Sequence, residues 1–293
     1  MGESIGSGTG GSAAGEQAGK RGYITRSILR MPERRKTSRK GDFGRVLVIG
    51  GSTDFAGAPT LAAAAAKGVL RSGADIAILA APAGVAWAVN AICSDIITKK
   101  LSGGHISGKH SKELTEEAGK ADVVLIGCGI GRKKSTMDLV RSLVKRLSKK
   151  GKLMVLDADA LKAVRLQDVK NSILTPHEKE FEAILKNSGI KDEKEARKKL
   201  GSNVLLIKGD KDRIISKDKT AYNKTGNPVM TKGGTGDVLA GLCAGFLTQT
   251  KDPFRSACMA AYLNGAVGDY LKKRKGKTFI ASDIVDNIHK VLK

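Results

Sequence analysis

The sequence predicts an α/β fold in which helices flank both faces of a central, mostly parallel sheet. Short apolar runs rich in Val and Ile alternate with longer segments rich in Ala, Leu and Lys, which is the pattern of parallel strands joined by covering helices. Small and acidic residues follow several of the runs, as in GGSTDFAGAP, GCGIGR, DADA, TPHEKE and KGDKD. Because the carboxyl ends of parallel strands line one crevice, these motifs are expected to meet at a single edge of the sheet.

The expected strands are apolar runs that end at small or charged residues. They span residues 45–51, 75–81, 123–129, 152–158, 172–176 and 204–209, and RIIS and TAYN then predict a hairpin at the sheet edge. Helices are expected at residues 58–72, 135–149, 178–187, 192–200, 236–248, 254–273 and 282–292.

The chain is expected to form one domain from residue 41 to residue 293, because no internal repeat or second linker interrupts it. Residues 1–22 are rich in Gly and Ser and predict a flexible tail, and residues 23–40 predict a basic linker. The N-terminus lacks the apolar core of a secretion signal, and the longest apolar run is shorter than the roughly 20 residues of a membrane span. A cytoplasmic location without a membrane partner is therefore expected.

The formal net charge of +23 favours attraction to polyanions. The basic residues are spread over several segments, and aromatic residues make up only 4% of the chain, too few to form stacking platforms for single strands. A nucleic-acid partner is therefore disfavoured, whereas a substrate with several phosphates fits the same charge balance. Cys93, Cys128, Cys243 and Cys258 form no C-x-x-C pair and are expected to be buried thiols.

Two glycine-rich loops resemble nucleotide-binding motifs without matching them. GGSTDFAG lacks the Lys-Ser or Lys-Thr pair that a P-loop needs after Gly57. GCGIGR supplies Gly127, Gly129 and Gly131, but Arg132 stands where the dinucleotide fingerprint has its last glycine. Each loop taken alone is better explained as a tight turn between a strand and a helix.

Charged side chains at the other strand ends have both binding and structural explanations. Asp157 and Asp159 are candidates for holding Mg²⁺ through water, although helix capping is the better explanation for Asp159. His177 and Glu180 begin an amphipathic helix on which both can face the crevice, although a lone His is more often structural. Lys208 places a cation at the same edge, which suits a nucleotide phosphate.

The stretch TKGGTGDVLAG, residues 231–241, places a carboxylate between a glycine-rich turn and an apolar helix. Gly233, Gly234 and Gly236 allow several backbone N–H groups to point at one place, and the helix dipole adds positive potential, so the turn predicts an anion hole. Asp237 would repel a phosphate bound there, so its useful role is to accept a proton from a hydroxyl that attacks the phosphate. Stabilisation of the first helical turn by about 1 kcal/mol would explain the acid but not the glycines.

Five motifs occur in a fixed order from about residue 40 to the C-terminus: KGDFGRVLVIGGSTDFAGAPTLAAAAAKGVLRSGAD, DADAL, LTPHEKEF, LIKG and NPVMTKGGTGDVLAG. The Gly-x-Gly-Asp turn resembles the anion-hole signature of the ribokinase-like superfamily, and the whole set resembles the ADP-dependent NAD(P)H-hydrate dehydratases. The resemblance implies repair of hydrated NADH and NADPH, in which the nicotinamide ring is dehydrated at the expense of ADP, leaving AMP and phosphate.

The resemblance also implies roles for individual residues. The pocket for the hydrated dinucleotide would be lined by Ala58, Gly129 or Gly131, His177 and Asp237. The nucleotide and its phosphates would be held by Lys208, Gly209, Asp210, Lys211, Asp212, Gly233, Gly234 and Gly236. Asp237 would deprotonate the ring hydroxyl, and Glu180 is the candidate for holding Mg²⁺ through water.

The resemblance has departures and leaves alternatives open. Asp212 stands where the family often has Thr, and a carboxylate suits a nucleotide loop only if it points away from the phosphates or binds a metal. The GNPVM stretch resembles the ADP-using members of the family more than the ATP-using ones, which implies ADP as the phosphoryl donor. The family implies a homo-oligomer, and an NAD(P)H-hydrate epimerase would have to be a separate chain. The alternative functions are an ATP-dependent kinase of a hydroxymethylpyrimidine or thiazole alcohol and a basic nucleic-acid-binding protein.

Overall fold

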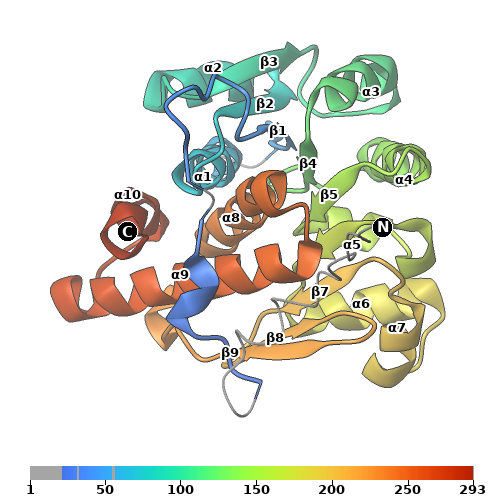
Figure 1. The fold of residues 1–293 in the computed structure, drawn as a ribbon. Helices are drawn as coiled ribbons and strands as arrows, with labels where there is room; N and C mark the ends of the chain where they lie inside the picture. The colour runs from blue at the N-terminus through green and yellow to red at the C-terminus, as the bar shows by residue number, and fades with distance from the viewer. Residues whose placement is uncertain (1–21, 32, 55–56, 293) are drawn as a thin grey trace, which may run out of the picture.

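The computed structural model describes residues 22–31, 33–54 and 57–292, which form a nine-stranded sheet between two layers of helices (Figure 1). The strands are β1 Arg45–Ile49, β2 Ile76–Pro82, β3 Ile97–Leu101, β4 Val123–Ile126, β5 Leu153–Leu156, β6 Ser172–Leu174, β7 Val204–Ile207, β8 Asp212–Ile215 and β9 Thr220–Asn223. The helices are α1 Ala58–Arg71, α2 Ala83–Ile92, α3 Ser111–Lys120, α4 Lys134–Lys149, α5 Asp159–Ala163, α6 Glu178–Ser188, α7 Glu193–Lys199, α8 Thr235–Thr250, α9 Pro253–Lys275 and α10 Ala281–Val291.

The strand order is β3-β2-β1-β4-β5-β6-β7-β8-β9. The strands from β3 to β7 pair in parallel, whereas β8 and β9 add an antiparallel edge hairpin. The predicted α/β class, the parallel sheet and the edge hairpin are confirmed. Because the chain first runs outward from β1 to β3 and then returns to β4, the strand order reverses between β1 and β4, and ligands bind at such a point in open α/β sheets.

The side chains of each strand alternate between two hydrophobic cores. In β1, Val46 and Val48 face the core formed with α1, α2, α8, α9 and α10, whereas Leu47 and Ile49 face the core formed with the helices from α3 to α7. All four side chains are almost completely buried. Burial on both faces explains why the strands are continuously apolar in the sequence.

Some elements were absent from the sequence prediction. The edge strand β3 reads ITKKL and is half exposed, so it lacks the apolar signal of the inner strands. The segment of α2 looked like an interrupted apolar run because Pro82 and Gly84 flank its start. In α3 only Leu114 and Ala118 are buried, too few to reveal a helical period.

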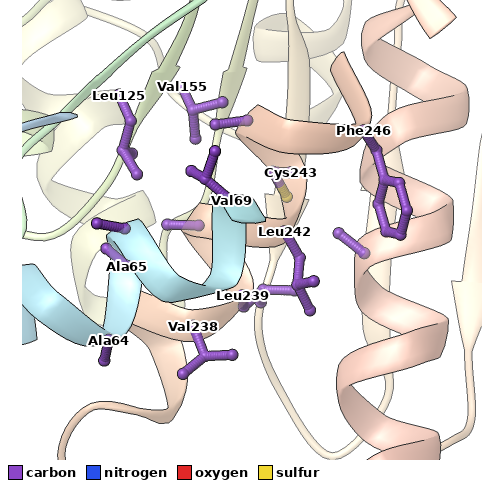
Figure 2. Packing of buried hydrophobic residues seen from close by; sticks show 14 of the residues in the cluster. Ala64, Ala65, Val69, Leu125, Val155, Val238, Leu239, Leu242, Cys243 and Phe246 are labelled. Carbon is purple, nitrogen blue, oxygen red and sulfur yellow. The ribbon is translucent and has the colours of Figure 1, made fainter. Parts of the chain in front are cut away.

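Helix α8 packs closely against α1 because small residues line the contact. Figure 2 shows Ala64, Ala65 and Val69 on α1 where it crosses α8, with Leu125 of β4 and Val155 of β5 above them. At Gly241 of α8 an added Cβ would lie 2.1 Å from the backbone oxygen of Ala65, so no side chain fits there. This contact fixes the position of α8 under the sheet and therefore the position of its N-terminal turn.

The N-terminal segment packs onto the sheet edge and the helical layer. The backbone of Ile24 donates a hydrogen bond to the carbonyl of Tyr222 in β9, and the short 3₁₀ helix Arg26–Leu29 buries Ile28. The predicted flexible tail lies outside the described residues except for Gly22, and the domain boundary at residue 41 stays a prediction.

All four cysteines are free and buried, as predicted. Among the described residues, none of the helices combines the length and the apolar character needed to cross a membrane.

Replacing Gly241 by Ala is expected to lower the free energy of unfolding by about 1–3 kcal/mol, because the new methyl group would collide with the α1 backbone. The matched control is Gly119→Ala in the exposed last turn of α3, where an added Cβ meets nothing within 4 Å. That change is expected to be neutral or stabilising by up to about 1 kcal/mol. Equal urea-unfolding curves for the two variants would contradict the close contact between α1 and α8.

Candidate active site

Four side chains from four chain segments meet at the carboxyl edge of the sheet. Cys128 follows β4, Asp157 follows β5, Lys208 follows β7, and Asp237 lies in the first turn of α8. One ligand atom each of Cys128, Asp157 and Asp237 lies within 4.8 Å of the other two. The Nζ atom of Lys208 donates a hydrogen bond to Oδ1 of Asp157 at 3.0 Å.

Asp157 is the anchor of this cluster. It is 2% exposed, and its Oδ1 also accepts a hydrogen bond of 2.6 Å from the hydroxyl of the buried Thr175. Burial alone would lower the pKa of Lys208, but the charges of Asp157 and Glu180 outweigh it and the net shift is upward. Lys208 is therefore a permanent cation at the base of the crevice.

Asp237 lies in an environment that weakens its acidity. Burial and then the negative charge of Asp157 raise its pKa from 3.8 to about 7, although hydrogen bonding by the Cys128 thiol and the charge of Lys208 act in the opposite direction. A carboxyl group with a pKa near neutrality can both accept and release a proton under physiological conditions, which is the property of a general base.

The glycine turn lies next to Lys208. Gly234 is the N-cap of α8 and has a φ of +90°, which a residue with a side chain rarely adopts. A Cβ added at Gly236 would lie 3.5 Å from Nζ of Lys208. Within the described part of the chain, the N–H groups of Gly233, Gly234 and Gly236 have no hydrogen-bond partner, so they are available to an anion together with the lysine.

Hydrogen bonds donated by the side chains of Lys232 and Thr235 fix the conformation of the glycine turn. The Lys232 ammonium donates to the carbonyl oxygens of Lys277 and Phe279 at 2.8 and 2.7 Å, and the Thr235 hydroxyl donates to the carbonyl of Met230 at 2.8 Å. These bonds fix the turn before any ligand binds.

The loop after β4 contains Gly127, Gly129 and Gly131, and its conformation requires glycine for steric reasons. Gly127 has a φ of +134°, and an added Cβ would lie 1.8 Å from the backbone oxygen of Asp157, so only glycine allows the two strand ends to lie so close. Gly129 and Gly131 also have positive φ values, 63° and 81°. Both candidates for the substrate pocket therefore belong to one loop, and the backbone conformation does not separate them.

His177 and Glu180 form a reciprocal capping box at the start of α6. The backbone N–H of His177 donates to Oε2 of Glu180 at 3.0 Å, and the N–H of Glu180 donates to Nδ1 of His177 at 3.3 Å. Because Nδ1 is an acceptor, a neutral His177 carries its proton on Nε2. The His177 side chain is 53% exposed, and Oε2 of Glu180 lies 4.0 Å from Nζ of Lys208, so both candidates lie beside the cluster.

Asp212 is hydrogen bonded within its own hairpin. Its Oδ1 accepts a hydrogen bond from the N–H of Gly209 and its Oδ2 accepts one from Asn223, at 3.2 and 3.0 Å, while burial raises its pKa. Asp212 therefore links the β7–β8 loop to β9. Asp210 and Lys211 are exposed in the same loop, and the structure brings neither of them into the cluster.

Two other predicted residues are Asp159, which was expected to cap a helix, and Ala58, which was expected to line the substrate pocket. The prediction that Asp159 caps the next helix is wrong: Ala158 is the N-cap of α5, no side chain caps it, and Asp159 forms an ion pair with Lys162. Ala58 is the first residue of α1. One turn further along α1, Leu61 lies against the glycine turn, since an added Cβ at Gly234 would be 3.5 Å from it.

Sequence reasoning missed Cys128 and Thr175 as members of the cluster. Cys128 is the residue between two glycines at a strand end, and Thr175 is a buried polar residue directly before Pro176. Both positions carry a recognisable signal, because a side chain at the end of a parallel strand borders the ligand crevice.

A separate cavity of about 660 Å³ is lined by residues of α3 and α4, among them Lys112, Thr115 and Arg146. It contains none of the clustered side chains and plays no part in the site described above.

Comparisons with known proteins agree with this geometry. A model of the NAD(P)H-hydrate dehydratase family matches residues 46–290. The bifunctional NAD(P)H-hydrate repair enzyme Nnr of Methanothermobacter thermautotrophicus is 42% identical over 276 residues, covering 90% of this chain and 53% of that protein. The ADP-dependent (S)-NAD(P)H-hydrate dehydratase of Nitrosopumilus maritimus is 37% identical over 280 residues, covering 90% of this chain and 93% of that protein. The chain thus spans about half the length of the Nnr relatives.

Solved structures show the same fold. The ADP/ATP-dependent NAD(P)H-hydrate dehydratase from Bacillus subtilis, co-crystallised with ATP and Mg²⁺, has a TM-score of 0.74 and 25% identity, covering 92% of this chain and 98% of that one. A ribokinase-like superfamily protein from Enterococcus faecalis has a TM-score of 0.79 and 24% identity, covering 92% and 94%.

Asp237→Asn is expected to stabilise the folded protein at about pH 8. The folded pKa of about 7 lies above the unfolded value of 3.8, so the folded state binds more protons between these values and loses stability as the pH rises through this window. Above about pH 7, the raised pKa of Asp237 lowers the free energy of unfolding of the parent by at most about 4 kcal/mol. In denaturant titrations, the difference in the free energy of unfolding between Asp237→Asn and the parent should therefore shrink as the pH falls towards about 4.

The control for this measurement is Asp218→Asn, which changes an exposed carboxylate between β8 and β9. If Asp237→Asn and Asp218→Asn had the same effect at both ends of the pH range, the raised pKa of Asp237 would be refuted.

Proposed function

The chain belongs to the NAD(P)H-hydrate dehydratase family, and from this premise we propose that it dehydrates hydrated NADH and NADPH at the expense of ADP, releasing AMP and phosphate. The observation that carries the proposal is the position of Asp237, a buried carboxylate that directly follows the unpaired N–H groups of the glycine turn and lies close to Lys208. The name of the Nitrosopumilus maritimus relative supports ADP as the phosphoryl donor.

The proposed reaction uses this arrangement in sequence. Asp237 accepts the proton of the hydroxyl on the hydrated nicotinamide ring, and the resulting oxygen nucleophile takes the terminal phosphoryl group of ADP, leaving AMP. The bond between the ring carbon and the phosphorylated oxygen then breaks, and phosphate leaves with its electron pair. The neighbouring ring carbon gives up a proton to solvent, and the electron pair of that C–H bond forms the ring double bond. The N–H groups of Gly233, Gly234 and Gly236 and the Lys208 ammonium stabilise the negative charge of the phosphoryl group during transfer.

Glu180 suits the proposed Mg²⁺ because it supplies a hard oxygen donor. One of its oxygens is bound by the capping box, and no hydrogen bond from the described residues reaches the other, Oε1. When bound, Mg²⁺ would neutralise phosphate charge, with Glu180 holding it through water.

The rest of the site follows the same proposal. Ala58, His177 and one of Gly129 and Gly131 line the pocket for the hydrated dinucleotide, and the loop from Lys208 to Asp212 holds the adenine nucleotide. In that loop Asp212 supports the backbone through its hydrogen bonds to Gly209 and Asn223.

We also propose a homo-oligomer and cooperation with a separate NAD(P)H-hydrate epimerase. The homo-oligomer is supported by Trp87, Ile92 and Ile97, three large apolar side chains that are 52–63% exposed on α2 and β3. The epimerase stays a prediction from the resemblance.

Asp237→Asn is expected to lower kcat for dehydration by about 10²- to 10⁴-fold, because the amide cannot accept the proton. The assay mixes hydrated NADH with ADP and Mg²⁺ and follows both the recovery of reduced-nicotinamide absorbance and the release of phosphate. Asp218→Asn is the matched surface control and should retain the parental rate.

Two further measurements separate the alternative functions. Transfer of phosphate from ATP to a hydroxymethylpyrimidine or thiazole alcohol without release of free phosphate would indicate a kinase, and salt-sensitive DNA retention without nucleotide turnover would indicate a nucleic-acid-binding protein. An Asp237→Asn variant as fast as the parent would refute the role of the base.

The pH dependence of kcat/KM is expected to follow the ionisation of Asp237 in the enzyme without bound substrate. Activity should fall about tenfold per pH unit below about pH 7 and level off above it, since only the ionised carboxylate accepts a proton. In Asp157→Asn the inflection should move to lower pH, because the charge of Asp157 is, after burial, a cause of the raised pKa. An inflection that stays in place in this variant would contradict the coupling between the two carboxylates.

A further inference from the structure

Cys128 has no role in the proposed reaction, yet its thiol lies among the charged groups of the site. It is completely buried, and its ligand atom lies within 4.8 Å of those of Asp157 and Asp237. Ligand atoms around a tetrahedral zinc ion are about 3.5 Å apart, given bond lengths of about 2.0–2.3 Å. A small rotation of the side chains would therefore bring all three atoms into one coordination sphere.

Both carboxylates have oxygen atoms to offer. The hydrogen bonds from Thr175 and Lys208 reach the same atom of Asp157, Oδ1, and within the described part of the chain no hydrogen bond reaches Oδ2. Asp237 forms no ion pair with any described Lys, Arg or His residue. The donors are thus present without breaking the contact between Asp157 and Lys208.

The charge balance also favours a cation. When Asp237 is ionised, the buried carboxyl groups of Asp157, Glu180 and Asp237 lie around the ammonium of Lys208, so negative charge is in excess there. A sulfur donor selects thiophilic cations, whereas Mg²⁺ prefers oxygen ligands and keeps several waters. The ion that fits here therefore differs from the Mg²⁺ that accompanies the nucleotide.

We propose that Cys128, Asp157 and Asp237 form a binding site for a thiophilic divalent cation of the Zn²⁺ type, and that its occupation blocks the enzyme. On binding, the S–H bond of Cys128 breaks, the proton passes to solvent, and the thiolate and the two carboxylates bind the metal. The bound carboxylate of Asp237 can no longer accept a proton from the substrate. The metal site does not depend on the proposed function, whereas the inhibition rests on it.

The test uses Cd²⁺ as the probe, because its bond to a thiolate gives an ultraviolet charge-transfer band. Cd²⁺ is titrated into the full chain without nucleotide or Mg²⁺. The parent is expected to bind one Cd²⁺ per chain with this band, and Cys128→Ser and Asp157→Asn are each expected to weaken binding at least about tenfold. Asp157→Asn keeps the thiol, so the test remains decisive if Cys128→Ser fails to fold.

The matched control is Cys243→Ala, which removes another completely buried thiol, two turns along α8 from Asp237. It should bind Cd²⁺ as the parent does. Absence of the band in the parent, or unchanged binding in Asp157→Asn and in a folded Cys128→Ser, would overturn the site.

Inhibition is measured separately from binding. With ADP and Mg²⁺ in excess, Zn²⁺ is expected to inhibit dehydration by the parent at least about tenfold more strongly than by Cys128→Ser, each compared with its own rate without Zn²⁺. Equal inhibition of both proteins would overturn the blocking effect. A parent that binds Cd²⁺ but shows no dehydratase activity would refute the proposed function and leave the metal site established.

Discussion

The burial of Asp237 beside a second carboxylate is the constraint on which the rest of the site depends. Desolvation and the charge of Asp157 disfavour the ionised form, and the pKa of about 7 is the balance of these effects against Lys208 and the Cys128 thiol. An exposed carboxylate would be ionised but too weak a base, whereas a buried one without Lys208 would stay protonated at neutral pH. The site therefore requires both a dry environment and a fixed cation.

The fold supplies these two conditions through separate contacts. Close packing of α8 on α1, which Gly241 permits, brings the first turn of α8 under the carboxyl ends of β4 and β5 and shields Asp237 from water. Parallel pairing of β5, β6 and β7 places Asp157, Thr175 and Lys208 at the same edge, where Asp157 orients the lysine. A change in either contact would alter the pKa of Asp237 without changing Asp237 itself.

The sequence predicted the inner strands, the long helices and the meeting of motifs at one edge, because their signals are local. Continuous Val and Ile runs mark strands buried on both faces, and small or acidic residues mark where they end. It could not predict which acid of DADA turns inward: Asp157 is buried against Lys208, whereas Asp159 faces Lys162. That choice depends on the positive φ of Ala158 between them, 51°, and on neighbours more than 40 positions away in the chain. The orientation of Asp212 could not be predicted either, because its partner Asn223 comes from the next strand of the hairpin.

Lys208 links the pKa of Asp237, the proposed base, to the proposed binding of the nucleotide. Its ammonium contacts Asp157, lies 4.0 Å from Glu180 and lies beside Gly236 in the glycine turn, so one cation faces both the base and the place proposed for the phosphate. A bound phosphate adds negative charge near Asp237 and, by itself, would raise the pKa of that carboxyl further. The positive charge of the helix terminus and of Lys208 counters this effect, as would a cation held by Glu180. In the proposed reaction, phosphate binding and proton acceptance by Asp237 are therefore compatible only while these positive charges remain in place, which gives a physical reason for the acid, the lysine and the glycine turn to occur together.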